Sequence, residues 1–313
     1  DPTVTELEKM GADFFSKEAG LFVSSGTMGN LVALLAHCQR GDEIILGDKS
    51  HIVRGEAGGA STLGGISIRT VRNNHRGMVD LNEVEAAINP NDPHYARTRL
   101  ISLENTHNSC GGSVLTPQDT ASITEIAKHH DILVHIDGAR IFNSSVYLKT
   151  PVSELTKDVD SVTFCLSKGL SAPVGSVLCG TRETIEKARR WRKALGGGMR
   201  QAGIIAAAGI VALKTMVTRL SDDHANAISL AQGLSKIPGI EINPEEVQTN
   251  LVFFKVNSIS EIEIAQQLNK RGIKVQPRKP RWRLATHYGI TSADIKYSLK
   301  VFKEVLSDQV NHI

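Results

Sequence analysis

The sequence predicts an α/β protein with a largely parallel β-sheet that carries helices on both faces. Short runs rich in β-branched residues alternate with helical apolar patterns over most of the chain. Reactive polar residues directly follow several of these runs. A chain of 313 residues also exceeds the size at which one hydrophobic core grows comfortably, so we expect one large and one smaller domain.

Seven strand-like runs are expected to form the main sheet. They cover residues 21–25, 43–48, 65–71, 99–105, 132–137, 161–167 and 175–180. Helical patterns at 30–41, 81–88 and 116–130 separate several of these runs, as crossover helices do in a parallel sheet. A long helix is expected over 204–220, and it ends a large domain of residues 1–220.

Residues 221–313 are expected to form a small α+β domain. The order of the patterns is βαββα. The expected strands cover 250–256, 273–276 and 281–286, and the expected helices cover 260–272 and 291–306.

Charge and cysteine spacing argue against several classes of function. The chain has 36 basic and 33 acidic residues, a formal net charge of +3, which gives no reason to expect a nucleic-acid or membrane partner. No apolar run approaches the roughly 20 residues that a bilayer span needs, so we expect a cytoplasmic protein. The four cysteines lack paired spacing, and no metal site is predicted.

Polar side chains follow four of the predicted strands. His51 and His107 follow the second and fourth runs, Asp137 ends the fifth with Arg140 just beyond it, and Lys168 ends the sixth. Ligands bind beyond the carboxyl ends of the strands in an open parallel sheet. We therefore expect these side chains on one rim, with Lys168 held rigidly at the last position of its strand.

The stretch SSGTMGN at residues 24–30 predicts a phosphate site on the same rim. Gly26 allows a tight backbone turn, Ser25 and Thr27 offer hydroxyls, and a helix N-terminus presents free N–H groups. The stretch lacks the Walker spacing, and the chain has no G-x-G-x-x-G motif, which disfavours a nicotinamide-dependent dehydrogenase.

A phosphate site, a reactive amine and a carboxylate together indicate pyridoxal 5'-phosphate (PLP). Its aldehyde bonds covalently to a lysine, here Lys168, and an aspartate, here Asp137, keeps its ring nitrogen protonated. Ser167 beside the lysine offers a further hydroxyl to the phosphate. A structural alternative for each residue stays open: a charged strand end for Lys168 and a helix cap for Asp137.

Five stretches closely resemble the low-specificity L-threonine aldolases, which are fold-type-I PLP enzymes of the β-eliminating lyase group. They are SSGTMGNLVALLAHC, SLENTHN, HIDGARIFN, CLSKGLSAPVGS and WRKALGGGMRQAGI. The resemblance is strongest over residues 20–210 and implies an aspartate aminotransferase-like fold and a homo-oligomer, a dimer of dimers. The family has a further N-terminal segment, so we expect this sequence to be a fragment.

The resemblance also implies roles for individual residues. His51 would stack on the cofactor ring and contact the substrate hydroxyl, and His107 would place a second imidazole near that hydroxyl. Arg140 and Arg283 would bind the substrate carboxylate, with Arg140 also near the cofactor. Arg200 would contact the phosphate across a subunit boundary. For Arg283, misalignment with Arg278 or Arg281 stays open, as does a surface ion pair for Arg140 and a packing role for Arg200.

The implied reaction is retro-aldol cleavage of L-threonine or L-allo-threonine to glycine and acetaldehyde, a step of glycine biosynthesis. The base would be His51 or His107. Related β-hydroxy-α-amino acids are further expected substrates. The alternatives are another PLP-dependent fold-type-I lyase, an aminotransferase, or a PLP-binding paralogue without activity.

Overall fold

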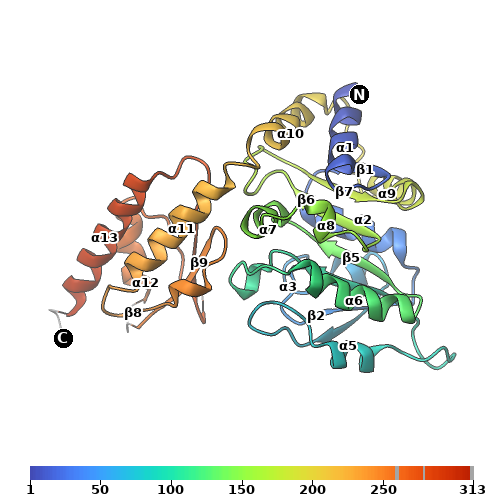
Figure 1. The fold of residues 1–313 in the computed structure, drawn as a ribbon, viewed down its shortest axis with the longest axis horizontal. Coiled ribbons are helices and arrows are strands. Elements are labelled where there is room, and N and C mark those ends of the chain that lie inside the picture. Colours follow the sequence, from blue (N-terminus) through green and yellow to red (C-terminus); the bar gives the residue numbers. More distant parts are fainter. Residues whose placement is uncertain (258–260, 278, 311–313) are drawn as a thin grey trace. The chain divides into compact units, whose positions relative to one another are not determined.

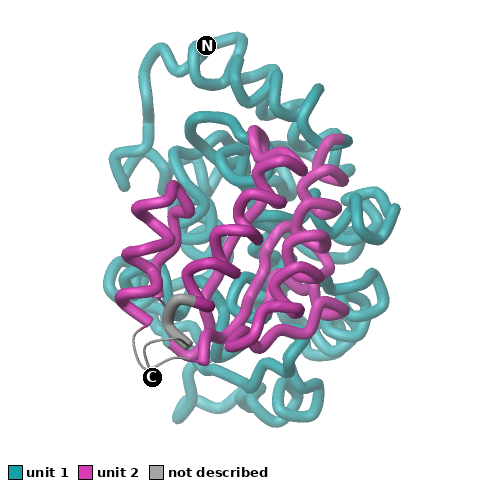
Figure 2. Tube along the Cα trace, turned by 90° about the vertical axis from the view of Figure 1, so that its left-hand side faces the viewer, with its two compact units in different colours: residues 1–110, 114–218 teal, residues 111–113, 219–313 magenta. Residues whose placement is uncertain are grey.

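The computed structural model describes residues 1–257, 261–277 and 279–310. It consists of two compact units, shown in different colours in Figure 2. Unit 1 contains Asp1–Cys110 and Val114–Thr218, and unit 2 contains Gly111–Ser113 and Arg219–Ile313. The division into domains at residue 220 stays a prediction.

Unit 1 is built on a seven-stranded sheet (Figure 1). The strand order is β1-β7-β6-β5-β4-β2-β3. Neighbouring strands from β3 to β6 pair in parallel, whereas β7 runs antiparallel to both β1 and β6. The strands are β1 Ala19–Val23, β2 Glu43–Gly47, β3 Ser67–Val71, β4 Thr98–Glu104, β5 Leu133–Asp137, β6 Ser161–Cys165 and β7 Ser176–Gly180. The predicted mainly parallel sheet of seven strands is confirmed.

Helices cover both faces of this sheet. Consecutive residues of a strand point to opposite faces. Thr163 of β6 lies against Gly29 of α2, whereas its neighbour Phe164 packs on Phe142 of α7. Helices α4 and α9 contact α2 on the first face, and α8 contacts α7 on the second. The helices of unit 1 are α1 Pro2–Phe14, α2 Gly26–His37, α3 His51–Arg54, α4 Gly59–Thr62, α5 Leu81–Ala87, α6 Pro117–His129, α7 Ile141–Leu148, α8 Val152–Leu155, α9 Arg182–Ala194 and α10 Gly203–Thr215, with a 3-10 turn η1 at Asn108–Cys110.

Unit 2 has a small antiparallel sheet of order β10-β9-β8. Its core includes the buried side chains of Phe254, Trp282 and Phe302. The elements are α11 Leu220–Leu234, β8 Ile240–Glu241, the 3-10 turn η2 Pro244–Glu246, β9 Leu251–Val256, α12 Glu261–Lys270, β10 Trp282–Ala285 and α13 Ser292–Val310. Residue 260 of the predicted helix 260–272 lies outside the described residues, as does Arg278.

Two predicted elements are wrong. The strand expected at 273–276 is absent from the described residues, because the side chain of Asn269 takes both backbone groups of Val275, at 3.3 Å to its N–H and 2.7 Å to its carbonyl. The helix expected over 204–220 ends at Thr215, just before the β-branched Val217 and Thr218, which have low helix propensity.

No single helix among the described residues is long and apolar enough to cross a membrane. Helices α10 and α11 reach the required length and apolarity only when the two are counted together.

Phe164, the residue before the last of β6, lies at the centre of an aromatic cluster. Its ring stacks on Phe15 at a centroid distance of 5.1 Å and meets the edge of Phe142 at 5.4 Å. All three rings are buried. The cluster therefore fixes β6 against the second helix layer.

We predict that Phe164→Ala lowers the free energy of unfolding by about 3–5 kcal/mol, because it leaves a cavity in this cluster. Urea unfolding followed by circular dichroism measures the loss. Leu63→Ala, at a side chain that is 53% exposed, serves as the control and should change the free energy by less than about 0.5 kcal/mol. Equal losses in the two variants would contradict the assigned role of Phe164.

Candidate active site

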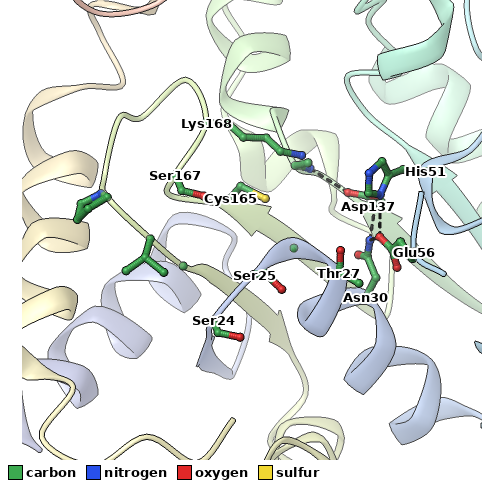
Figure 3. Close-up of a pocket in the computed structure, with 15 residues that line it drawn as sticks. Ser24, Ser25, Thr27, Asn30, His51, Glu56, Asp137, Cys165, Ser167 and Lys168 are labelled. Carbon is green, nitrogen blue, oxygen red and sulfur yellow. Dashed lines mark hydrogen bonds and ion pairs between the residues drawn. The ribbon is translucent and has the colours of Figure 1, made fainter. Parts of the chain in front are cut away.

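A cavity of about 310 Å³ lies in unit 1, where β5 and β6 end and α2 begins (Figure 3). It brings together seven of the predicted site residues, namely Ser25, Gly26, Thr27, His51, Asp137, Ser167 and Lys168. The remaining lining residues are Ser24, Asn30, Glu56, Ala139, Cys165, Pro173, Val174 and Gly175.

Lys168 lies in the loop that joins β6 to β7, so the expected position at the end of a strand is wrong. Strand β6 ends at Cys165, because the chain turns there into an antiparallel hairpin. Leu166 donates its N–H to the carbonyl of Gly175 at 3.0 Å and accepts from the N–H of Ala172 at 3.0 Å. These bonds hold the loop, and the Lys168 side chain points toward Asp137 and His51 in Figure 3.

The start of α2 forms one end of the cavity. Ser25 is the N-cap, and its hydroxyl accepts from the N–H of Met28 at 3.1 Å. The first N–H groups of a helix have no partner within the helix and carry a partial positive charge, which suits an anion. A Cβ atom on Gly26 would lie 2.8 Å from the sulfur of Cys165, so glycine permits this close approach of backbone and strand end.

Asp137 ends β5 and is buried, with both carboxylate oxygens hydrogen-bonded. Oδ1 accepts from the N–H of Ala139 at 3.1 Å, and Oδ2 accepts from the amide of Asn30 at 2.9 Å. The same amide group of Asn30 donates to Oε1 of Glu56 at 2.8 Å. The buried amide therefore separates two carboxylates, and Figure 3 shows it between them.

His51 bonds to Glu56 through Nδ1, at 2.8 Å from Oε1. This hydrogen bond raises the pKa of His51. Burial likewise raises the pKa of Glu56. Both directions favour a proton on the pair, so the pair keeps that proton to a higher pH than an isolated histidine does.

Glu104, at the end of β4, holds the backbone beside His51. Its Oε2 accepts from the N–H of His51 and its Oε1 from the N–H of Asn108, each at 2.7 Å. Burial is the main cause that raises the pKa of Glu104 to about 7. The carboxylate thus joins the start of α3 to the loop after β4.

Four predicted residues are not among those that line this cavity. His107 is buried against Gly77, and its Nε2 lies 3.9 Å from Oε2 of Glu104. Burial lowers the pKa of His107 to about 4. Arg140 follows the cavity residue Ala139, Arg200 lines a separate cavity of unit 1, and Arg283 lies on β10 in unit 2. Their roles stay predictions.

Sequence reasoning missed Asn30, Glu56 and Glu104. Glu104 carried a readable signal, because it ends an apolar strand as Asp137 does. Asn30 is a polar residue in a helix whose following residues, Leu31–Ala36, are all apolar, and it lies one turn after Gly26. Glu56 carried no comparable signal. It lies in the turn after α3, and only the fold of that turn brings its side chain to the ring of His51.

Donor atoms of His51, Glu56 and Asp137 lie within 4.8 Å of one another, a spacing that could suit a metal ion. However, Asn30 points amide hydrogens at both carboxylates. A cation requires lone pairs from the same oxygens. The described cluster is therefore organised by hydrogen bonds.

Known proteins resemble this chain in sequence and in fold. Residues 1–257 match the family model described as beta-eliminating lyase. The chain is 46% identical to low-specificity L-threonine aldolase 1 of Arabidopsis thaliana, over 98% of this chain and 87% of the relative. It is similar in fold to the Leishmania major threonine aldolase, with a TM-score of 0.81 at 19% identity, over 97% of this chain and 89% of the other. A structure of SPT, serine palmitoyltransferase, with PLP gives a TM-score of 0.76 at 20% identity, covering 97% and 76% of the two chains.

We predict that Glu56→Gln lowers the pKa of His51, because the neutral amide no longer stabilises the imidazolium. NMR titration of the His51 ring protons measures the change. Glu85→Gln is the matched control, since Glu85 bonds to the ring of His130 at 2.6 Å outside the cavity. An unchanged His51 pKa in Glu56→Gln would show that the hydrogen bond does not set it.

Proposed function

The chain belongs to the beta-eliminating lyase family, and we propose that it cleaves L-threonine and L-allo-threonine to glycine and acetaldehyde. It acts as a PLP-dependent aldehyde lyase. The observation that carries the proposal is the cavity of unit 1, in which the amine of Lys168, the carboxylate of Asp137 and the start of α2 face one space. Related β-hydroxy-α-amino acids are expected substrates too.

The donor set of this cavity fits PLP. Hydroxyls of Ser25, Thr27 and Ser167 and the first turn of α2 suit its phosphate, and buried Asp137 suits its ring nitrogen. Lys168 supplies the amine that bonds to its aldehyde. When bound, PLP accepts the electron pair left by the broken Cα–Cβ bond.

The remaining residues would bind and orient the substrate. His51, held by Glu56 and Glu104, would accept the proton of the β-hydroxyl once the pair has lost its own proton. His107 remains the alternative base. Arg140 and Arg283 would bind the carboxylate, which orients the Cα–Cβ bond for cleavage.

The products that are released distinguish the proposed reaction from two rival reactions and from an inactive PLP-binding protein. An aminotransferase would convert a keto acid to an amino acid, and a β-eliminating enzyme would release ammonia from serine-like substrates. A PLP-binding paralogue without activity would give neither product and no glycine. The protein is therefore incubated with PLP and L-threonine or L-allo-threonine, with and without a keto acid, and glycine and acetaldehyde are quantified. Equal amounts of the two products support the proposal, and their absence overturns it.

We further propose a homo-oligomer, a dimer of dimers, in the cytoplasm. Helix α10 supports self-association, because it exposes Ile204 by 84% and Val211 by 58% on the face that also carries Ala207. Arg200 precedes this helix and would reach a neighbouring subunit.

The four free, buried cysteines support a reducing compartment. Release of glycine would make the reaction a step of glycine biosynthesis.

Lys168→Ala should abolish both glycine release and the borohydride-reducible bond to PLP, because the cavity loses the amine that holds the aldehyde. Mass spectrometry of the reduced, digested protein locates the bond. Lys157→Ala, at an exposed lysine outside the cavity, is the control. A reduced adduct that persists on another residue of Lys168→Ala would contradict the assignment.

Asp137→Asn should still bind PLP but lower kcat by roughly 10²–10³, because an amide does not hold the ring nitrogen protonated. Steady-state kinetics and fluorescence titration of PLP separate the two effects. Asp158→Asn, in a partly exposed ion pair with Lys128, should leave kcat unchanged. Near-normal turnover in Asp137→Asn would show that another group faces the ring nitrogen.

A further inference from the structure

A chain of buried polar side chains runs from Asn30 away from the cavity. Nε2 of His135, on β5, lies 3.3 Å from Oδ1 of Asn30. Nδ1 of His135 lies 2.8 Å from the hydroxyl of Ser161, which in turn lies 2.7 Å from Nε2 of His37. His135 and Ser161 are fully buried, and Asn30 is nearly so. The proposed mechanism uses none of the three groups beyond Asn30.

The direction of each hydrogen bond follows from counting donors. Both amide hydrogens of Asn30 serve the carboxylates of Glu56 and Asp137, so Oδ1 must accept and Nε2 of His135 must donate. Burial lowers the pKa of His135 to about 3, so the ring is neutral and its Nδ1 accepts. Ser161 then donates its single hydrogen to Nδ1 and accepts from His37.

Charged groups face this chain mainly at its ends. Asp137 and Glu56 lie at the cavity end, with His51 and Lys168 beyond them. Arg99 and Lys187 act on His37 at the other end. The side chains of His135 and Ser161, in the middle of this hydrogen-bonded series, are neutral. The direction of the hydrogen bonds therefore determines how these side chains are oriented.

His135 matters most when Glu56 takes up a proton. A protonated Glu56 can donate, and Asn30 could then turn its oxygen toward Glu56 and away from His135. Such a flip would replace the N–H that Asp137 receives with a carbonyl oxygen. The donor on His135 opposes the flip, because a turned amide would present N–H to N–H.

We propose that His135 is a positioning residue, which acts through Asn30 to keep Asp137 aimed at the ring nitrogen of PLP while the His51–Glu56 pair gains and loses its proton. The inference rests on the proposed function for its effect on turnover. Its effect on bound PLP requires cofactor binding alone. Substitutions at His135 therefore test it even if the substrate is a different amino acid.

The test compares His135→Asn with His135→Gln. The side-chain amide of glutamine reaches the position of Nε2 and keeps a donor for Asn30, whereas that of asparagine reaches only the position of Nδ1 and serves Ser161. The readout is the pH midpoint of the visible absorbance change of bound PLP. We expect His135→Asn to raise this midpoint by about one unit. A less protonated ring nitrogen withdraws electrons more weakly, so the nitrogen that joins Lys168 to PLP keeps its proton to a higher pH. His135→Gln should restore it.

Kinetics provide the second readout. In His135→Asn, kcat should fall about tenfold with KM changed less than about twofold, and His135→Gln should stay within about twofold in both. Equal midpoints and equal kcat in the two variants would overturn the proposal, because a merely structural role does not distinguish them. Wild-type protein that binds PLP with this pH dependence but releases no glycine would overturn the proposed function alone.

A measurement on unaltered protein avoids any loss of folding in the variants. ¹⁵N NMR of histidine-labelled holoenzyme reports which ring nitrogen of His135 carries the proton. The proposal requires the proton on Nε2 and a bare Nδ1 at neutral pH. A proton on Nδ1 would overturn it, since Asn30 would then have no donor at its oxygen.

Discussion

The buried amide of Asn30, placed between the carboxylates of Glu56 and Asp137, is the interaction on which the cavity depends. Two buried carboxylates repel each other, and each costs free energy when it lacks hydrogen bonds. One amide group donates to both, at 2.8 and 2.9 Å. Because Asn30 lies one turn after Gly26, a single helix supplies both the N-terminal N–H groups that suit an anion and the amide that orders the carboxylates.

The sheet brings the reactive groups to this helix. Strands β5 and β6 are neighbours, so the end of β5 places Asp137 beside the loop that leaves β6 with Lys168. Antiparallel β7 closes that loop as a hairpin, and the aromatic cluster around Phe164 packs β6 against the helix layer that contains α7. Glu104 at the end of β4 completes the rim by holding the backbone of His51.

Much of this arrangement could be predicted from the sequence, because strand ends and helix starts leave local signals. Those signals located Lys168, Asp137, His51 and the residues around Gly26. They did not show where β6 ends, since the apolar pattern continues through Leu166 while the hydrogen bonds already belong to the hairpin. Asn30 and Glu56 were missed because their partners come from other elements, and only the fold shows such contacts.

We propose that Asn30 and Asp137 together keep the ring nitrogen of the cofactor protonated. The most direct test is ¹⁵N NMR of the protein loaded with PLP labelled at the ring nitrogen. We expect the chemical shift of a protonated pyridine nitrogen at neutral pH and well above it. The shift of an unprotonated ring nitrogen in the folded, loaded protein would show that Asn30 and Asp137 do not have this role.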